Sequence, residues 1–343
     1  KYGQYMPPSL ITSLMTSLIE HDKDSEILEP SSGDGAFIEE LFYKGFKNIT
    51  GIEIDKDLIP KEYESIIKND DFLSYEFNKK FDVIIGNPPY IRWKNLEDEL
   101  KKVLEKNYWW NTYCNSLCDY SMPFLLKSVD LLKDKGELIF ITSEYWLSST
   151  NGQRVRDYLL ENGSIEKIII FDDKPVFDKV RVSLIIFKYI KNKKIKEITV
   201  IKSKDTKKLD YIECDQILNK NGDKINIFKI DQFKYGHTWY ITEDDIIQKL
   251  NIFEEKCTIG GKIQKLDDYV IISNGMVSGL DEAFNVTGLK LNEKEQQACI
   301  TVIKAKNLNQ YYYDNKSRYF FLNELNIDES DLIKDYPNIY NHL

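Results

Sequence analysis

Short apolar runs alternate with polar turns and amphipathic stretches from the start of the chain to about Tyr189. The runs are typical of buried strands, and helical periodicity predicts helices over Ser9–Glu20, Ser121–Leu132 and Gln153–Glu161. Strands that alternate with helices predict a doubly wound, mainly parallel α/β sheet, whose last two strands should be antiparallel because the loop between them has no helical pattern. The seven predicted strands are Glu26–Leu28, Ile49–Ile54, Ile66–Lys68, Phe81–Ile85, Glu137–Thr142, Ile165–Phe171 and Val182–Tyr189.

The pattern changes after Tyr189, where a lysine-rich tract begins. Two interpretations compete: a strand at the sheet edge guarded by lysines, which we favour, and a basic stripe that follows a phosphate backbone. From about Trp239 onward we expect a second domain, so the predicted boundaries are 1–240 and 241–343. The lysines of the tract are Lys188, Lys191, Lys193, Lys194, Lys196, Lys202, Lys204, Lys207 and Lys208.

Composition narrows the class of protein. The chain has 343 residues, of which 42% are hydrophobic and 30% charged, enough for two domains with real cores. Its net charge of −9 argues against a surface that binds nucleic acid everywhere, although a local basic face fits this charge. The five cysteines and three histidines lack the spacing of a metal site, so we expect free thiols and no metal.

The ends of the chain and its hydropathy bear on location. The sequence holds no uncharged apolar run long enough for a bilayer, and its first residues lack the layout of a signal peptide. We therefore expect a cytoplasmic protein without a membrane segment. The sequence begins without Met and stops within a segment whose pattern continues to its last residues, so we expect a fragment of a longer protein.

Three strand ends carry residues suited to a nucleoside. The first predicted strand leads into Glu29–Phe37, a turn in which Gly33 and Gly35 let the backbone approach a ligand. Ile38 occupies the place of the third glycine of the dinucleotide fingerprint, which disfavours nicotinamide. Glu53 ends the second strand, where a carboxylate can accept from both hydroxyls of a ribose.

The third strand ends at Asp71 and Phe72. A carboxylate there can accept from an adenine amino group, and the neighbouring ring can stack on the purine. A strand-end acid taken alone is more often a cap or a solvated turn. Because the carboxyl ends of parallel strands meet in one crevice, the three signals together predict a nucleoside cofactor.

The fourth strand ends at Asn87-Pro88-Pro89-Tyr90. Two prolines stiffen the turn, so that the Asn87 side chain and the Pro88 carbonyl offer two fixed acceptors. An aryl amine is a poor nucleophile because its lone pair is delocalised, and two acceptors on its hydrogens would localise that pair for attack on a methyl sulfonium. Tyr90 is placed to stack on a flipped base; the alternative is a rigid turn with a packed tyrosine.

These motifs and their order resemble the gamma-type N6-adenine DNA methyltransferases of restriction-modification systems, the TaqI methyltransferase group. The likeness begins at Gly3–Pro8, where the family usually has Thr in place of Pro7, and runs through the whole chain. It implies a seven-stranded Rossmann-like methyltransferase sheet that binds S-adenosyl-L-methionine. The residues it assigns to the cofactor are Tyr5, Pro7, Glu29, Pro30, Ser31, Gly33, Gly35, Glu53, Ile54, Asp71, Phe72 and Asn87.

The resemblance also implies a reaction, a substrate and partners. It assigns catalysis on N6 of a flipped-out adenine to Asn87-Pro88-Pro89-Tyr90, with Phe177 as a second ring against the base; the alternative for Phe177 is a loop ring that covers the core edge. Double-stranded DNA is the implied substrate, and a cognate restriction endonuclease is a candidate partner. The rivals are transfer to a glutamine amide of a protein such as a release factor, and to an amino group of an rRNA base.

The C-terminal part resembles the start of the family's target-recognition domain. Asn274–Phe284 and Ile303–Leu308 are similar to segments that recur there. For Lys304 and Lys306 a role facing DNA and simple surface exposure are equally favoured.

Overall fold

The structure is a computed structural model, and its chain divides into two compact units, residues 1–259 and 260–343. Each unit is described by itself. The residues that the structure describes are 6–172, 174–177, 183–242, 246, 248–250, 252–253, 256, 269–270, 280–304, 307–308, 312, 316–321 and 328–343.

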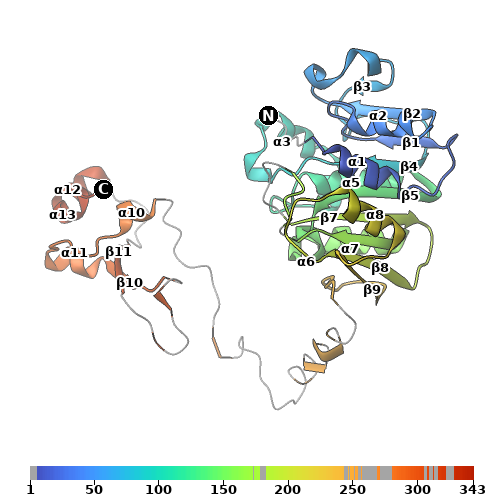
Figure 1. Cartoon of the computed structure of the whole chain (residues 1–343). Coiled ribbons are helices and arrows are strands. Elements are labelled where there is room, and N and C mark those ends of the chain that lie inside the picture. The colour runs from blue at the N-terminus through green and yellow to red at the C-terminus, as the bar shows by residue number, and fades with distance from the viewer. Residues whose placement is uncertain are drawn as a thin grey trace. The chain divides into compact units, whose positions relative to one another are not determined.

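One sheet forms the centre of the larger unit (Figure 1). Its first five strands pair in parallel with one another, β7 is antiparallel to both β5 and β6, β8 is parallel to β6, and β9 is antiparallel to β8. Among the described residues the sheet has nine strands, in the order β3 (Ile67–Asn69), β2 (Asn48–Glu53), β1 (Glu26–Glu29), β4 (Phe81–Gly86), β5 (Leu132–Ser143), β7 (Leu184–Lys191), β6 (Gly163–Ile170), β8 (Glu197–Ser203) and β9 (Ile225–Asp231).

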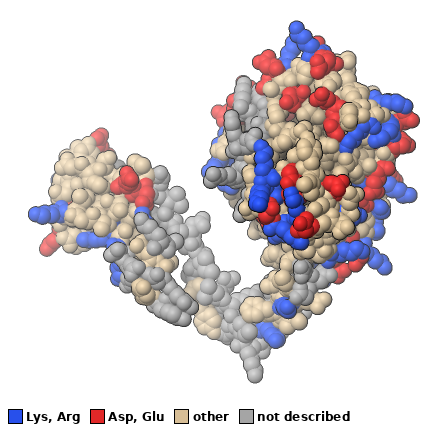
Figure 2. All heavy atoms as spheres, viewed as in Figure 1, with Lys and Arg blue, Asp and Glu red and all other residues tan. Residues whose placement is uncertain are grey.

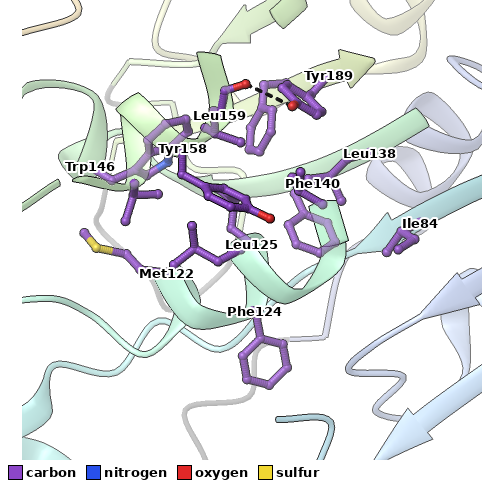
Figure 3. Packing of buried hydrophobic residues seen from close by; sticks show 14 of the residues in the cluster. Ile84, Met122, Phe124, Leu125, Leu138, Phe140, Trp146, Tyr158, Leu159 and Tyr189 are labelled. Atoms are coloured by element: carbon purple, nitrogen blue, oxygen red, sulfur yellow. Dashed lines mark hydrogen bonds between the residues drawn. The ribbon is translucent and has the colours of Figure 1, made fainter. Parts of the chain in front are cut away.

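Helices cover both faces of this sheet because each buries an apolar stripe against it. One hydrophobic cluster joins the sheet to α1 (Ser9–Thr16), α2 (Ala36–Tyr43) and α8 (Tyr211–Asn219). The opposite cluster joins it to helices on the other face, where Tyr189 of the sheet donates a hydrogen bond to the Leu159 carbonyl at 2.9 Å (Figure 3). The helices of that face are α3 (Asp98–Leu104), α4 (Tyr108–Tyr113), α5 (Ser121–Leu131), α6 (Tyr145–Ser148) and α7 (Gln153–Asn162).

The seven strands expected from the apolar runs are all present, and the expected antiparallel pairing of β6 with β7 is confirmed. The edge position expected for the lysine-rich tract is wrong. β8 lies within that tract, but β9 pairs along the whole length of β8 and thereby becomes the last strand among the described residues. β9 was not predicted because its apolar residues, Ile225, Ile227, Phe228 and Ile230, do not alternate strictly with polar ones; of these, only Ile225 and Ile230 are buried.

The lysines of the tract do not form an unpaired basic stripe. Lys193 lies 3.5 Å from Glu166, and Lys202 lies 2.9 Å from Asp172. Figure 2 shows the same mixture more widely, with Lys and Arg side chains next to Asp and Glu on the visible face of the larger unit. These pairs weaken the interpretation of the tract as a phosphate-binding stripe.

The smaller unit has a short antiparallel ribbon and a hydrophobic cluster of Val286, Phe320 and Ile339, against which Phe284 and Leu332 pack. Within it Glu295 is fully buried and accepts from the Asn292 and Asn338 backbones. Its described elements are α10 (Asp281–Phe284), α11 (Glu293–Gln297), β10 (Cys299–Val302), β11 (Ser317–Phe320), α12 (Glu329–Asp335) and α13 (Pro337–Tyr340).

Of the two lysines considered for DNA contact in the smaller unit, only Lys304 is among the described residues. Lys304 forms an ion pair with Asp281 at 2.5 Å, and the Tyr319 hydroxyl donates to the other Asp281 oxygen at 2.7 Å. Lys306 and residues 274–279 lie outside the described residues. No helix in the described part of either unit is long and apolar enough to cross a membrane.

Lys188, the first lysine of the lysine-rich tract, is completely buried at the centre of β7. Its ammonium lies 3.0 Å from Glu20, 3.1 Å from Glu137 and 3.5 Å from Glu166, and it donates to the Leu18 carbonyl at 3.0 Å. A buried charge is stable only where opposite charges and acceptors surround it. This group therefore ties the chain that follows α1 to three strands.

Replacing Lys188 with Met should destabilise the protein by about 3–5 kcal/mol, because Glu137 would remain buried without its cation. Urea unfolding followed by circular dichroism measures this loss. The double variant Lys188→Met with Glu137→Met should recover much of it, since the orphaned charge is gone. Equal stability of the single and double variants would contradict this account of the network.

Candidate functional site

A pocket opens where the carboxyl ends of β1, β2, β3 and β4 meet. β1 lies between β2 and β4, so the chain passes from one side of the sheet to the other at this point, which is where open α/β sheets bind ligands. The lining residues are Met6, Pro7, Glu29, Pro30, Ser31, Ser32, Gly33, Ala36, Phe37, Glu53, Ile54, Asp70, Asp71, Phe72, Asn87, Pro88, Pro89, Leu100, Tyr120 and Phe124.

The loop between β1 and α2 depends on two glycines. Gly33 has φ +52°, and a side chain there would bring its Cβ to 2.9 Å from the Met6 sulfur. Gly35 has φ +81° at the start of α2, where a Cβ would collide with the Tyr63 ring at 2.7 Å. Both positions need glycine, but only Gly33 lines the pocket.

Glu53 at the end of β2 is held in place by backbone donors. It is 3% exposed; one carboxylate oxygen accepts from the Gly33 N–H at 2.7 Å, and the other from the Asp55 N–H at 2.8 Å. Burial raises the pKa of Glu53, and these N–H donors act against that rise. A carboxylate has about four acceptor positions, so it can still accept from a ligand.

Glu29 at the end of β1 is the more unusual acid. It is 1% exposed, and one of its carboxylate oxygens has no hydrogen-bond partner among the described residues. Burial, followed by the charges of Glu53 and Asp34, raises its pKa well above the ordinary value. A buried polar atom without a partner in a pocket wall is suited to a ligand that donates to it.

Asp71 and Phe72 follow β3. The Asp71 carboxylate accepts from the Leu73 N–H at 3.1 Å and from the Ser74 hydroxyl at 2.8 Å, so it caps the turn as well as facing the pocket. Phe72 is 2% exposed, and its ring centre lies 5.0 Å from that of Phe124. The two rings give this end of the pocket an apolar wall that matches a flat base.

The turn after β4 is joined to the glycine loop. The Ser31 hydroxyl donates to the Asn87 carbonyl at 3.0 Å. Tyr90 reaches back with its hydroxyl to the Asn87 side-chain oxygen and to the Ile141 carbonyl, the latter at 2.5 Å. Burial, with a smaller effect of Asp119, raises the pKa of Tyr90 well above its usual range, so the hydroxyl stays a donor.

Most of the residues predicted for the cofactor meet in this pocket. Gly35, Tyr90 and Phe177 do not line it, and Tyr5 lies outside the described residues. Phe177 is 4% exposed and packs in the core between the sheet and α1, α2 and α8, as in its alternative interpretation. Its contact with a base therefore stays a prediction that requires the ring to leave the core.

Other lining residues were missed. Leu100, Tyr120 and Phe124 come from the segment between β4 and β5, where the sequence predicts only the helix Ser121–Leu132. Apolar side chains on a helix indicate a core before they indicate a pocket, so sequence alone had no signal for them. The other missed residues are Met6, Ser32, Ala36, Phe37 and Asp70, neighbours of predicted ones.

Residues 13–177 match the Eco57I restriction-modification methylase family. The chain is also 38% identical, over 98% of its own length, to the type II methyltransferase M.HindII of Haemophilus influenzae. The chain is thus similar to restriction-modification methylases over nearly all of its own length. It spans 65% of the length of M.HindII, and 64% of the length of M.HincII of Haemophilus influenzae, to which it is also 38% identical.

The solved structures agree on the fold. The methyltransferase subunit of a type I restriction-modification system from Streptococcus thermophilus superposes with a TM-score of 0.53 and 20% identity, over 67% of this chain and 56% of that one. With the strand order, this likeness confirms the predicted Rossmann-like methyltransferase fold. No group of three or more His, Cys, Asp or Glu in the described ranges is arranged to hold a metal ion.

Glu29→Gln should stabilise the ligand-free protein more at pH 8 than at pH 5. A carboxyl whose folded pKa is raised loses stability as pH rises above its unfolded value of 4.5 and until it passes the folded pKa, whereas an amide does not titrate. Thermal unfolding at the two pH values measures this; about 1 kcal/mol corresponds to roughly 2–4 °C. The exposed Glu64→Gln is the control, and a pH-independent Glu29→Gln effect would contradict the prediction.

Proposed function

We propose that the chain is the catalytic part of a DNA methyltransferase that transfers a methyl group from S-adenosyl-L-methionine to N6 of a flipped-out adenine. One observation carries the proposal: the Asn87-Pro88-Pro89 turn lines the same pocket as Glu53, Asp71 and Phe72. The printed names of the relatives, type II methyltransferases, and the restriction-modification methylase model support methyl transfer, and the resemblance to the gamma-type family supports adenine in DNA.

The pocket fits the proposed cofactor. Glu53, already oriented by two N–H donors, would accept from the ribose hydroxyls, and Asp71 with Phe72 would hold the base. Glu29 presents a buried carboxylate oxygen that has no partner within the described chain, which suits the amino group of the methionine end. Pro7 lines the pocket but cannot supply the hydroxyl that the family usually has there.

When bound, S-adenosyl-L-methionine supplies an electrophilic methyl group. The chain's own task is to prepare the amine: Asn87 and the Pro88 carbonyl would accept the two hydrogens, pull the nitrogen toward tetrahedral geometry and free its lone pair. The Ser31 and Tyr90 contacts hold Asn87 for this role. Because the proton is released after the C–N bond forms, no base of shifted pKa is required beforehand.

The substrate would reach this turn only outside the duplex. The Tyr90 hydroxyl contacts the Asn87 side chain, but the Tyr90 ring is partly buried and does not line the pocket, so its stacking on a base stays a prediction. For the chain as a whole we propose double-stranded DNA as substrate, a cognate restriction endonuclease as partner, a cytoplasmic location, a catalytic domain over 1–240 and the start of a target-recognition domain over 241–343.

The nature of the substrate is tested by offering labelled S-adenosyl-L-methionine with plasmid DNA, rRNA and a release-factor protein in parallel to the full-length enzyme. We expect label in DNA, at N6-methyladenine after digestion to nucleosides. Label in rRNA or protein alone would support the amide or rRNA alternatives. Label at a cytosine would keep DNA as substrate but overturn the choice of adenine.

Asn87→Ala should slow methyl transfer by about 10²–10³ while cofactor binding stays within about threefold of the wild type. Removal of one preorganised acceptor costs about 10²–10³ in rate, whereas the ribose and base contacts come from other strands. Single-turnover rates and calorimetry with S-adenosylhomocysteine separate the two effects. Parallel loss of binding and rate would show that Asn87 is needed for the pocket itself.

A further inference from the structure

A lysine behind the pocket holds the loop that follows β3. Lys127 lies on α5, one turn after Phe124, in a stretch where its helical neighbours are buried. Its ammonium donates to the Phe72 carbonyl at 2.6 Å, the Leu73 carbonyl at 3.2 Å and the Tyr75 carbonyl at 2.6 Å. All three acceptors belong to the loop that presents Asp71 and Phe72 to the pocket.

The contact is suited to holding a backbone in place. An ammonium has three N–H donors, and here each donor has a backbone carbonyl of the loop as its acceptor. The same ammonium lies 5.1 Å from the centre of the Phe72 ring, within range of a cation–π contact. Burial lowers the pKa of Lys127 to about 8, opposed by Asp71, Glu76, Asp130 and Asp70, so the side chain keeps its proton at neutral pH.

The helix that carries Lys127 is itself rigidly packed. Figure 3 shows Leu125 of α5 directed toward Phe140 and Tyr158, while the Phe124 ring points away from them. Phe124 meets the Phe72 ring instead, at 5.0 Å between ring centres. α5 is therefore a fixed support that touches the loop twice, through a ring on the pocket side and through an ammonium at the backbone.

We propose that Lys127 is a positioning residue that sets the selectivity of the pocket for adenine over other purines. This inference rests on the proposed function, in which Asp71 and Phe72 bind the adenine base of the cofactor. Stacking on Phe72 tolerates any purine, but the Asp71 carboxylate discriminates only when it is held at hydrogen-bond distance from the exocyclic amino group. Lys127 supplies that restraint through the backbone on the carboxyl side of Asp71.

The test compares two neutral ligands, 5′-methylthioadenosine and 5′-methylthioinosine. In the inosine ligand a carbonyl replaces the exocyclic amino group of the adenine. Their dissociation constants are measured by calorimetry for the wild type, Lys127→Met and Lys127→Gln. For Lys127→Met we expect the preference for the adenine ligand to fall by about tenfold, equivalent to about 1.4 kcal/mol. Lys127→Gln, which keeps two donors, should fall in between and remains informative if the Met variant does not fold.

Kinetics give a second readout. With DNA and S-adenosyl-L-methionine, Lys127→Met should raise KM for the cofactor and change kcat by less than about threefold, because the turn at Asn87 is untouched. The matched control is Lys80→Met: Lys80 also donates to a backbone carbonyl of α5, that of Asp130 at 2.6 Å, but its side chain is exposed and away from the pocket. It should change neither quantity.

The outcomes separate this inference from the proposed function. A wild type that binds neither S-adenosylhomocysteine nor the adenine ligand would overturn the proposed cofactor, and the inference with it. A wild type that prefers adenine, together with Lys127 variants that lose affinity for both ligands by the same factor, would leave the function standing and overturn the positioning role. Unchanged selectivity in a folded Lys127→Met variant would do the same.

Discussion

The parallel pairing of β1 with β2 on one side and β4 on the other is the constraint on which the site depends. Each of these strands ends in a polar turn, and parallel pairing brings those ends to one edge of the sheet. Glu29, Glu53 and Asn87, far apart in the chain, therefore line one pocket. The Ser31 hydroxyl then joins the turns after β1 and β4 through the Asn87 carbonyl.

Buried ionisable groups serve two different purposes in this fold. Lys188 is surrounded by three carboxylates and a carbonyl, so its charge is compensated inside the protein and stabilises the native arrangement of strands. Glu29 is not compensated: other acids lie near it, and one oxygen has no partner in the described chain. That acid makes the free protein less stable than it could be, a pattern expected where a site is prepared for a ligand.

α5 links core packing to ligand recognition. Its apolar side chains are held in the core, and the same helix presents Phe124 and Lys127 to the loop after β3. A change in the core under α5 would therefore be transmitted to Asp71 and Phe72 without touching any ligand. The family resemblance identifies the motifs that contact the cofactor, but such a supporting contact has no motif, because a lysine that donates to backbone carbonyls places no demand on the sequence of the loop.

The sequence by itself determined the seven apolar strands, the antiparallel pairing of β6 with β7 and the polar residues at the ends of β1 to β4, because strand periodicity and turn chemistry are local. Tertiary structure decided the rest. Only folding showed that Lys188 is buried, that β9 covers β8, that Phe177 and Tyr90 face the core rather than the pocket, and that α5 supports the loop after β3. A residue's burial and partners depend on segments distant in the chain, which no local pattern records.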